Sequence, residues 1–220
     1  STSHPSLVLG SYGETLTLVA SKYTKKAGIP AITISSTNPL ITANNDYYFS
    51  ATYTETMQGD ALAAFAVNMK KDSAATVKVE NDDTTTATIK RFTNRMKKLT
   101  ENNQSVVGNF TLSAQNTDYT DVIEQIRDSG ARTVFLSVSA KTAKEFLTQA
   151  TDNNLTHVLF LGTREWNDED FLKFVRENGK LNVAYPTEQS QNAETALSKA
   201  FLAAYKEKYG EDAEPSERTA

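Results

Sequence analysis

Short apolar runs rich in β-branched residues alternate with longer amphipathic stretches along most of the chain. Strands and helices that alternate in this way are typical of βαβ units and of a parallel sheet. The pattern predicts strands over residues 7–10, 30–35, 47–52, 76–79, 106–112, 133–138, 157–161 and 181–185. It predicts helices over residues 15–26, 58–69, 86–100, 119–129, 142–152, 168–178 and 193–209. The expected fold class is therefore α/β, with doubly wound parallel sheets.

The predicted strands fall into two groups. The last five strands, with their crossover helices, make a nearly complete doubly wound domain. The first three strands are accompanied by only two predicted helices, which is too few to cover both faces of a parallel sheet. We therefore expect two α/β lobes, the first of them incomplete.

A strand that runs directly into three hydroxyl residues is the most informative local feature. The apolar run at residues 30–34 ends in Ser35, Ser36 and Thr37, and Asn38-Pro39 then turns the chain. In an open α/β sheet, strand ends of this kind deliver polar groups to the ligand crevice. Their hydroxyls and free backbone amides can hold a carboxylate. The alternative interpretation is that these residues only cap and turn the chain.

Four stretches, taken together, resemble the type I periplasmic binding proteins, in particular the branched-chain amino-acid branch that serves ABC transporters. They read LVLGSYG at residues 7–13, GIPAITISSTNPL at 28–40, YTDVIEQIRDSG at 119–130 followed by TVFL, and FLG at 160–162 followed by WNDEDF. The resemblance implies a partial N-terminal lobe at residues 1–73, a C-terminal lobe at 74–213 and the start of the return to the hinge at 214–220. It also implies that the chain is a fragment without the family's opening strand–helix units and without its C-terminal return.

The resemblance assigns ligand contacts in the first lobe to two strand ends. The family's hydroxyl after the first strand aligns with Glu14, whose carboxylate would repel a ligand carboxylate unless it turns outward at a helix start. The amides of Tyr12 and Gly13, or the hydroxyl of Thr15, could then take its place. The other family contacts in this lobe match three hydroxyl residues, Ser35, Ser36 and Thr37.

The match is weaker in the second lobe. The family's aromatic lid aligns with Thr84, and its tyrosine with Ser139 or Ala140, so both stacking surfaces are absent. The family's acid, which neutralises the ligand ammonium, aligns with Arg164. If Arg164 points at the ligand, it favours an anion without a free ammonium. If the alignment slips by one residue, Glu165 is the ammonium partner, and a third interpretation makes Arg164 a solvated loop residue beside an eroded half-site.

Composition excludes several classes of function. A net charge of −4 with interspersed acids and bases argues against nucleic-acid binding. The chain has no cysteine for disulfides, thiolate metal sites or thiol catalysis. No apolar run approaches the roughly 18 residues of a membrane span, and Ser1 begins no signal peptide. We expect a chain without a membrane span of its own and without nucleic-acid partners.

An enzyme is not expected either. His4 and His157 have no motif partner for nucleophilic or metal chemistry. No glycine-rich nucleotide fingerprint is present, so no cofactor is expected. The acidic runs at residues 82–83 and 168–170 lie where helices begin, and we interpret them as helix starts in favourable contact with the helix dipole, not as a metal site.

Taken with the resemblance, these observations predict an exported solute-binding protein, periplasmic or lipid-anchored at the cell surface. Such a protein binds an amino acid or a related small carboxylate between two hinged lobes and delivers it to the permease of an ABC transporter. Two alternatives stay open. One is a ligand-sensing receptor domain on the same fold, since fold alone does not separate transport from sensing. The other is a remnant that no longer binds.

Overall fold

The computed structural model describes residues 5–11, 13–34, 36–52, 54, 56–81, 84–187 and 195–212, and the side chains of Glu14 and Thr84 lie outside this description. Contacts within the chain define two compact units. Unit 1 consists of Ser1–Glu55 together with Glu188–Ala220, and unit 2 consists of Thr56–Thr187. Both units contain a parallel sheet with helices between its strands, which confirms the predicted fold class.

Unit 1 is built on a three-stranded parallel sheet with the order β1-β2-β3. Its strands are β1 (Val8–Leu9), β2 (Ala31–Thr33) and β3 (Tyr48–Ser50), and its helical segments are α1 (Glu14–Ala27), η1 (Pro39–Ile41) and α7 (Ala196–Tyr209). Helix α1 ends at Gly28, whose φ of 67° is the left-handed conformation that glycine adopts most readily. The chain can therefore turn directly from α1 into β2.

Within the described residues, only one face of the sheet of unit 1 is covered. Ala31 and Tyr48 are buried on the face that α1 covers. The other face carries Leu9, Ile32 and Phe49, which lie in register on neighbouring strands. Leu9 is 71% exposed and Phe49 is 54% exposed. The prediction that the first three strands have too few helices to cover both faces holds for this sheet.

Unit 2 is built on a five-stranded parallel sheet with the order β5-β4-β6-β7-β8. Its strands are β4 (Ala74–Val79), β5 (Val106–Leu112), β6 (Thr133–Ser137), β7 (Leu159–Leu161) and β8 (Asn182–Ala184). Its helical segments are α2 (Met57–Asn68), α3 (Thr84–Thr100), α4 (Thr120–Asp128), α5 (Ala140–Asp152), η2 (Arg164–Trp166) and α6 (Glu169–Glu177).

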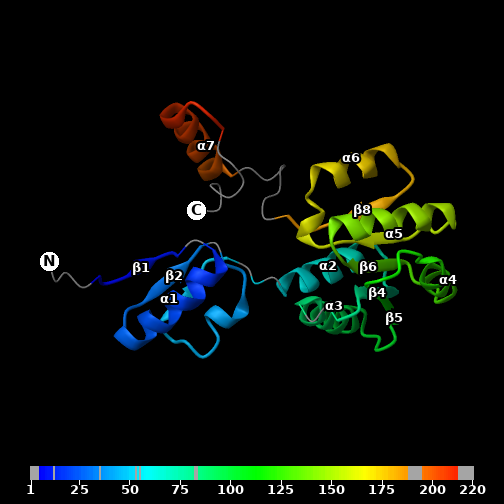
Figure 1. Ribbon diagram of the computed structural model, residues 1–220, viewed down its shortest axis with the longest axis horizontal. Helices are drawn as coiled ribbons and strands as arrows, with labels where there is room; N and C mark the ends of the chain where they lie inside the picture. Colours follow the sequence, from blue (N-terminus) through cyan, green and yellow to red (C-terminus); the bar gives the residue numbers. More distant parts are fainter. Residues whose placement is uncertain are drawn as a thin grey trace. The chain divides into compact units, whose positions relative to one another are not determined.

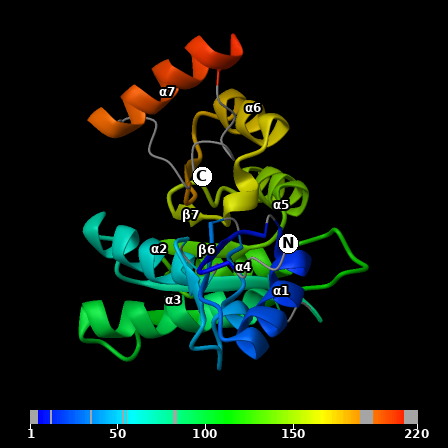
Figure 2. The ribbon, with the colours of Figure 1, turned by 90° about the vertical axis from the view of Figure 1, so that its left-hand side faces the viewer.

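Helices cover both faces of this second sheet. Phe135 of β6 packs with Leu62 of α2 and Phe92 of α3 on one face. Its neighbours Val134 and Leu136 point to the opposite face and pack with α4, α5 and α6, as the alternation of side chains along a strand requires. Helices α2 and α3 lie side by side on one side of the sheet, with α5 and α6 on the other (Figures 1 and 2). Unit 2 is thus doubly wound, as predicted.

The predicted strands and helices all occur, with ends shifted by a few residues. Strand β2 ends at Thr33, earlier than predicted, because the Thr33 hydroxyl accepts the Ser36 N–H at 3.2 Å and turns the chain out of the ladder. The 3₁₀ segments η1 and η2 were not predicted, since single turns are too short to show a period. Among the described helices, none combines the length and the apolar character needed to cross a membrane.

Helix α2 belongs to unit 2 by its contacts, because it packs against α3 and the five-stranded sheet. The predicted division places the same helix in the N-terminal lobe, at residues 1–73. The division into lobes at 1–73 and 74–213, with a return at 214–220, stays a prediction for the complete protein.

Candidate functional site

The predicted site residues follow the carboxyl ends of strands. In a parallel sheet these ends share one edge, which is where open α/β sheets bind ligands. In unit 1 the loops after β1 and β2 meet this edge, and the two strands are direct neighbours. In unit 2 the edge is formed by the loops after β4, β6 and β7, which are also neighbours in the sheet. Within each unit, the strand ends that precede the predicted residues are therefore neighbours in one sheet.

The turn from β1 into α1 is held by two buried hydroxyl groups. Gly10 and Gly13 have φ values of 112° and 84°, a backbone conformation that residues other than glycine rarely adopt. Thr17 Oγ1 donates to the carbonyl of Ser11 at 2.9 Å and to that of Gly13 at 2.5 Å. Tyr48 Oη donates to the carbonyl of Gly10 at 2.5 Å. Gly13 is the N-cap of α1, and it has no side chain that could cap the first N–H groups of this helix.

The loop after β2 contains a buried hydroxyl without a partner. Ser36 and Thr37 are 3% and 7% exposed. The Ser36 N–H donates to Thr33 Oγ1, and the Ser36 carbonyl accepts from Thr52 Oγ1 at 2.8 Å, so the backbone here is fixed from both sides. The Ser36 Oγ has no hydrogen-bond partner within the described residues. Buried polar atoms are normally paired, and an unpaired one calls for an explanation such as a ligand or a water molecule.

Several predicted residues lie wholly or partly outside the described residues. Tyr12 and Ser35 are not described, nor are the side chains of Glu14 and Thr84. The backbone of Glu14 forms the first position of α1, which is the helix start that the sequence analysis considered for it. The contacts assigned to these four residues stay predictions.

Ser139 lies at the end of β6 and acts as the N-cap of α5. Its Oγ accepts the Thr142 N–H at 3.3 Å and lies 3.1 Å from the Thr142 hydroxyl. This is the usual role of a serine immediately before a helix. The side chain is exposed. A ligand that contacted the Ser139 Oγ would share this atom with the Thr142 N–H.

Arg164 and Glu165 lie in η2, directly after β7. Arg164 is half-buried, and its backbone N–H donates to Oε1 of the buried Gln58 at 3.2 Å. Glu165 is exposed. The structure therefore fixes the backbone of this loop through α2. The ligand contact assigned to Arg164 stays a prediction.

Trp166 anchors the same loop. It is fully buried, its ring centroid lies 4.8 Å from that of Phe171, and its indole N–H donates to the carbonyl of Val138 at 3.1 Å. A tryptophan in a loop at this edge of the sheet can either stack on a ligand or pack against a neighbouring residue such as Phe171. The structure supports the packing role and shows that Trp166 ties the loop after β7 to the end of β6.

Sequence reasoning missed four polar residues at the same edge of unit 2: Gln58, Lys78, Ser137 and Thr163. Gln58 could have been found, because it is a polar residue on the stripe of α2 that buries Leu62 and Ala66. Ser137 carries no comparable signal, since a serine inside a strand is common. Asp168, by contrast, caps α6 as expected, with its Oδ1 accepting the Phe171 N–H at 2.9 Å.

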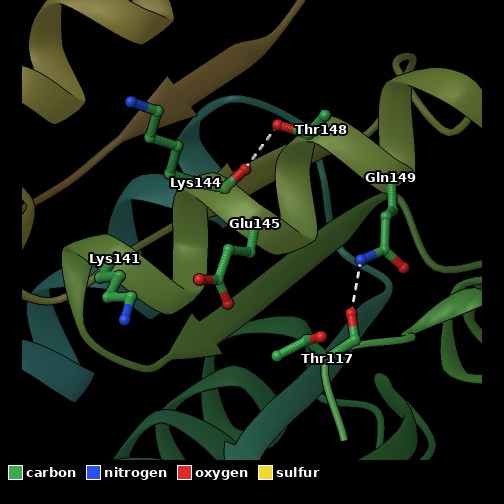
Figure 3. A pocket seen from close by; sticks show the side chains of 6 residues that line it. All are labelled: Thr117, Lys141, Lys144, Glu145, Thr148 and Gln149. Carbon is green, nitrogen blue, oxygen red and sulfur yellow. Dashed lines mark hydrogen bonds between the residues drawn. The ribbon is translucent and has the colours of Figure 1, made fainter.

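An open pocket of about 590 Å³ lies beside α5 (Figure 3). Its polar groups largely satisfy one another, since Gln149 Nε2 donates to the Thr117 carbonyl at 2.6 Å and Thr148 Oγ1 donates to the Lys144 carbonyl at 2.8 Å. The lining residues are not among the predicted site residues, and they form a surface hollow between α5 and the loop before α4. Within the described residues, no cluster of histidines and acids could hold a metal ion.

Two buried tyrosines predict a loss of stability at alkaline pH. Burial raises the pKa of Tyr48, and burial together with the Glu145 carboxylate raises the pKa of Tyr119. The unfolded chain then loses these protons first, so their contribution to stability is intact below about pH 10 and is lost as the pH rises through the folded-state pKa. We expect the free energy of unfolding to fall above about pH 10. Urea titrations from about pH 8 to about pH 11 should show a shallower fall for Tyr48→Phe and Tyr119→Phe than for the wild type.

A model of the family described as periplasmic binding protein matches residues 2–220. No functionally curated protein matches the sequence.

Solved structures share the fold. A Rhodospirillum rubrum protein described as a branched-chain amino acid ABC transporter has a TM-score of 0.78 and 20% identity over 96% of this chain. The LivJ substrate-binding protein of Streptococcus pneumoniae, in complex with isoleucine, has a TM-score of 0.66 and 22% identity over 96% of this chain. A solute-binding protein of R. palustris, in complex with 4-hydroxybenzoate, has a TM-score of 0.65 and 18% identity over 97% of this chain. The chain spans 60%, 59% and 58% of these three proteins, respectively.

Proposed function

The chain belongs to the periplasmic binding protein family, and from this premise we propose that it serves to bind a small carboxylate solute. Membership confirms the family that four stretches of the sequence resemble. The family is one of solute-binding proteins and not of enzymes. The proposal assigns the carboxylate to the strand ends of unit 1, and it places the complete protein outside the cytoplasmic membrane, where it would pass its ligand to an ABC transporter permease.

The Ser36 hydroxyl, which has no partner among the described residues, is the observation that carries this proposal. It is buried just after the end of β2. The neighbouring strand β1 leads into the N-terminus of α1, where the N-cap residue Gly13 has no side chain to cap the helix. A hydroxyl donor and helix N–H groups at one sheet edge suit a carboxylate, because the positive end of the helix dipole favours an anion. The aligned Glu14 is the first residue of α1, a position that favours an acid even when it does not touch the ligand.

The ligands named for the solved structures share one group. Isoleucine, leucine, 4-hydroxybenzoate and 3,4-dihydroxybenzoic acid all carry a carboxylate, and the last two carry no ammonium. The carboxylate is therefore the part of the ligand that we carry over to this chain. The ammonium partner is not carried over, because Arg164 occupies the position that the resemblance assigns to an acid.

Replacing Ser36 by alanine is expected to weaken binding of a carboxylate ligand about 10- to 100-fold, because a hydrogen bond to a charged group contributes about 1.5–3 kcal/mol. Isothermal titration calorimetry with a panel of amino acids and small carboxylates measures this. The free energy of unfolding without ligand should stay the same or rise, since the variant removes an unpaired buried atom.

Ser105→Ala is the matched control for this variant. Ser105 Oγ is also buried without a partner in the described residues, but it precedes β5 and so lies at the opposite, amino edge of the sheet of unit 2. It should leave every affinity unchanged. An unchanged affinity in Ser36→Ala, for a ligand that binds the wild type, would contradict the proposed carboxylate site.

A further inference from the structure

Gln58, the second residue of α2, makes a hydrogen bond to a distant loop of unit 2. Its Oε1 accepts the backbone N–H of Arg164 at 3.2 Å. Arg164 is the first residue of η2, which follows β7 at the carboxyl edge of the sheet. Because a backbone N–H only donates, its partner must be the oxygen and not the nitrogen of the Gln58 amide. This contact therefore fixes the orientation of the amide.

The position of Gln58 is itself fixed by burial and by packing. Gln58 is 3% exposed. The next residue, Gly59, packs so closely on α3 that a Cβ there would overlap the Thr88 carbonyl and lie 2.8 Å from the Phe92 nitrogen. Contact as close as this leaves the start of α2 little room to move against α3. Gln58 thus offers the Arg164 N–H an acceptor at a defined point.

The Arg164 loop, residues 162–167, is also held at its two ends. The Gly162 N–H donates to the Ala184 carbonyl of β8 at 2.9 Å, and the Trp166 indole N–H donates to the end of β6 at 3.1 Å. The bond from Gln58 lies between these two contacts, at Arg164 itself. Helix α2 therefore holds the middle of the loop.

The middle of this loop carries the two residues that matter for ligand charge. The resemblance to the family assigns the partner of a ligand ammonium to Arg164, or to Glu165 if the alignment slips by one residue. The two are consecutive, so a shift of the Arg164 nitrogen moves both side chains. Groups that recognise a ligand work only when their supports hold them within about 0.5 Å of the productive geometry.

We propose that Gln58 is a positioning residue for ligand recognition by unit 2. It acts through the Arg164 loop, by holding the backbone that presents Arg164 and Glu165, and so it helps to set which solutes this loop accepts. The inference rests on the proposed function, since only a solute-binding chain uses the loop in this way. It concerns unit 2 alone and does not depend on the carboxylate site at Ser36.

Hydrogen exchange of the full chain without ligand, followed residue by residue by NMR, tests the contact. Gln58→Met keeps the length of the side chain and removes the acceptor, so we expect the Arg164 amide to exchange about tenfold faster. Gln58→Glu keeps an acceptor oxygen and should restore most of the protection. Amides of the central strand β6 report the global stability of each variant, and the rate at Arg164 is compared with theirs.

Thr76→Val is the matched control. It removes a buried hydrogen bond elsewhere in unit 2, in which Thr76 Oγ1 donates to Asn109 Oδ1 at 2.8 Å between the middle parts of β4 and β5. This variant should lose stability as Gln58→Met does. It should leave the exchange of the Arg164 amide, relative to β6, unchanged.

A double-mutant cycle tests the role in recognition. Calorimetric titration with leucine, isoleucine, 4-hydroxybenzoate and a panel of further amino acids and small carboxylates identifies a ligand. We expect Gln58→Met to weaken its binding about tenfold. In a chain with both Arg164→Ala and Glu165→Ala, the backbone N–H and its bond to Gln58 remain, but the side chains that the bond positions are gone. There, Gln58→Met should change the affinity less than about twofold.

Three results overturn the inference. In the first, the Arg164 amide exchanges no faster in Gln58→Met. In the second, Gln58→Met weakens binding equally with and without the side chains of Arg164 and Glu165, so that it acts elsewhere. In the third, Thr76→Val weakens binding as strongly as Gln58→Met, which would make the effect one of stability alone.

Failure of the proposed function gives a different result. If no member of the panel binds the folded wild type, the proposed function and the inference both fail, whatever the exchange rates are. If binding responds to Ser36→Ala but not to Gln58→Met, only the inference is wrong. If it responds to Gln58→Met but not to Ser36→Ala, only the site in unit 1 is wrong. Circular dichroism melts establish that each variant folds before affinities are compared.

Discussion

Replacing Trp166 by alanine is expected to lower the free energy of unfolding of the chain by about 3–5 kcal/mol, the range found for removing a buried tryptophan or phenylalanine. Trp166 is fully buried against Phe171, and it packs so closely on Gly162 that a Cβ there would overlap the indole ring. The variant also leaves the Val138 carbonyl without the indole N–H that it now accepts at 3.1 Å. Urea unfolding followed by far-ultraviolet circular dichroism measures the change.

Trp166→Phe separates packing from the hydrogen bond. It keeps most of the aromatic volume and loses the indole N–H, so we expect a loss of about 1–3 kcal/mol. If Trp166→Ala changed stability by less than about 1 kcal/mol but abolished ligand binding, the side chain would be a ligand contact and not the loop anchor that the structure shows.

Replacing Gly59 by alanine is expected to lower the free energy of unfolding by about 2 kcal/mol or more. Alanine is favoured over glycine inside a helix by about 1 kcal/mol, so propensity alone predicts a gain. At this position, however, a Cβ would overlap the Thr88 carbonyl and lie 2.8 Å from the Phe92 nitrogen, both on the backbone of α3. Overpacking typically costs about 1–3 kcal/mol and occasionally more. Because backbone atoms cannot rotate away, we expect a cost at the upper end of this range, which outweighs the gain.

Gly179→Ala is the matched control, because a Cβ there would meet no atom within 4 Å. It should change the unfolding free energy by no more than about 0.5 kcal/mol. A Gly59→Ala protein as stable as the Gly179→Ala protein would mean that α2 and α3 pack less closely than the structure describes.

Much of the fold could be predicted because its signals are local. The period of apolar residues identified the strands and helices, and strand endings in glycine or hydroxyl residues marked the carboxyl edges. The same local signal placed Ser36 at a strand end, where its hydroxyl is buried and has no partner among the described residues. Ser139 was also placed correctly after β6, but the cap that it forms on α5 was missed, although a serine before a helix is a common N-cap.

The polar contacts at the carboxyl edge of unit 2 could not be predicted, because the residues that make them are far apart in sequence. Gln58 and Arg164 are 106 positions apart, and only the packing of α2 on the sheet brings them to hydrogen-bonding distance. Lys78 pairs in register with Ser137 only because β4 lies beside β6, an order that the sequence of strands along the chain does not reveal.

By itself, the sequence determined the α/β class, the positions of the elements, the family and the strand end at Ser36, because each depends on residues close together along the chain. The tertiary structure decided which unit α2 joins, that Trp166 is an anchor, and which buried polar atoms lack partners. These depend on long-range pairing and on burial, which arise only when distant segments pack and exclude water from the groups between them.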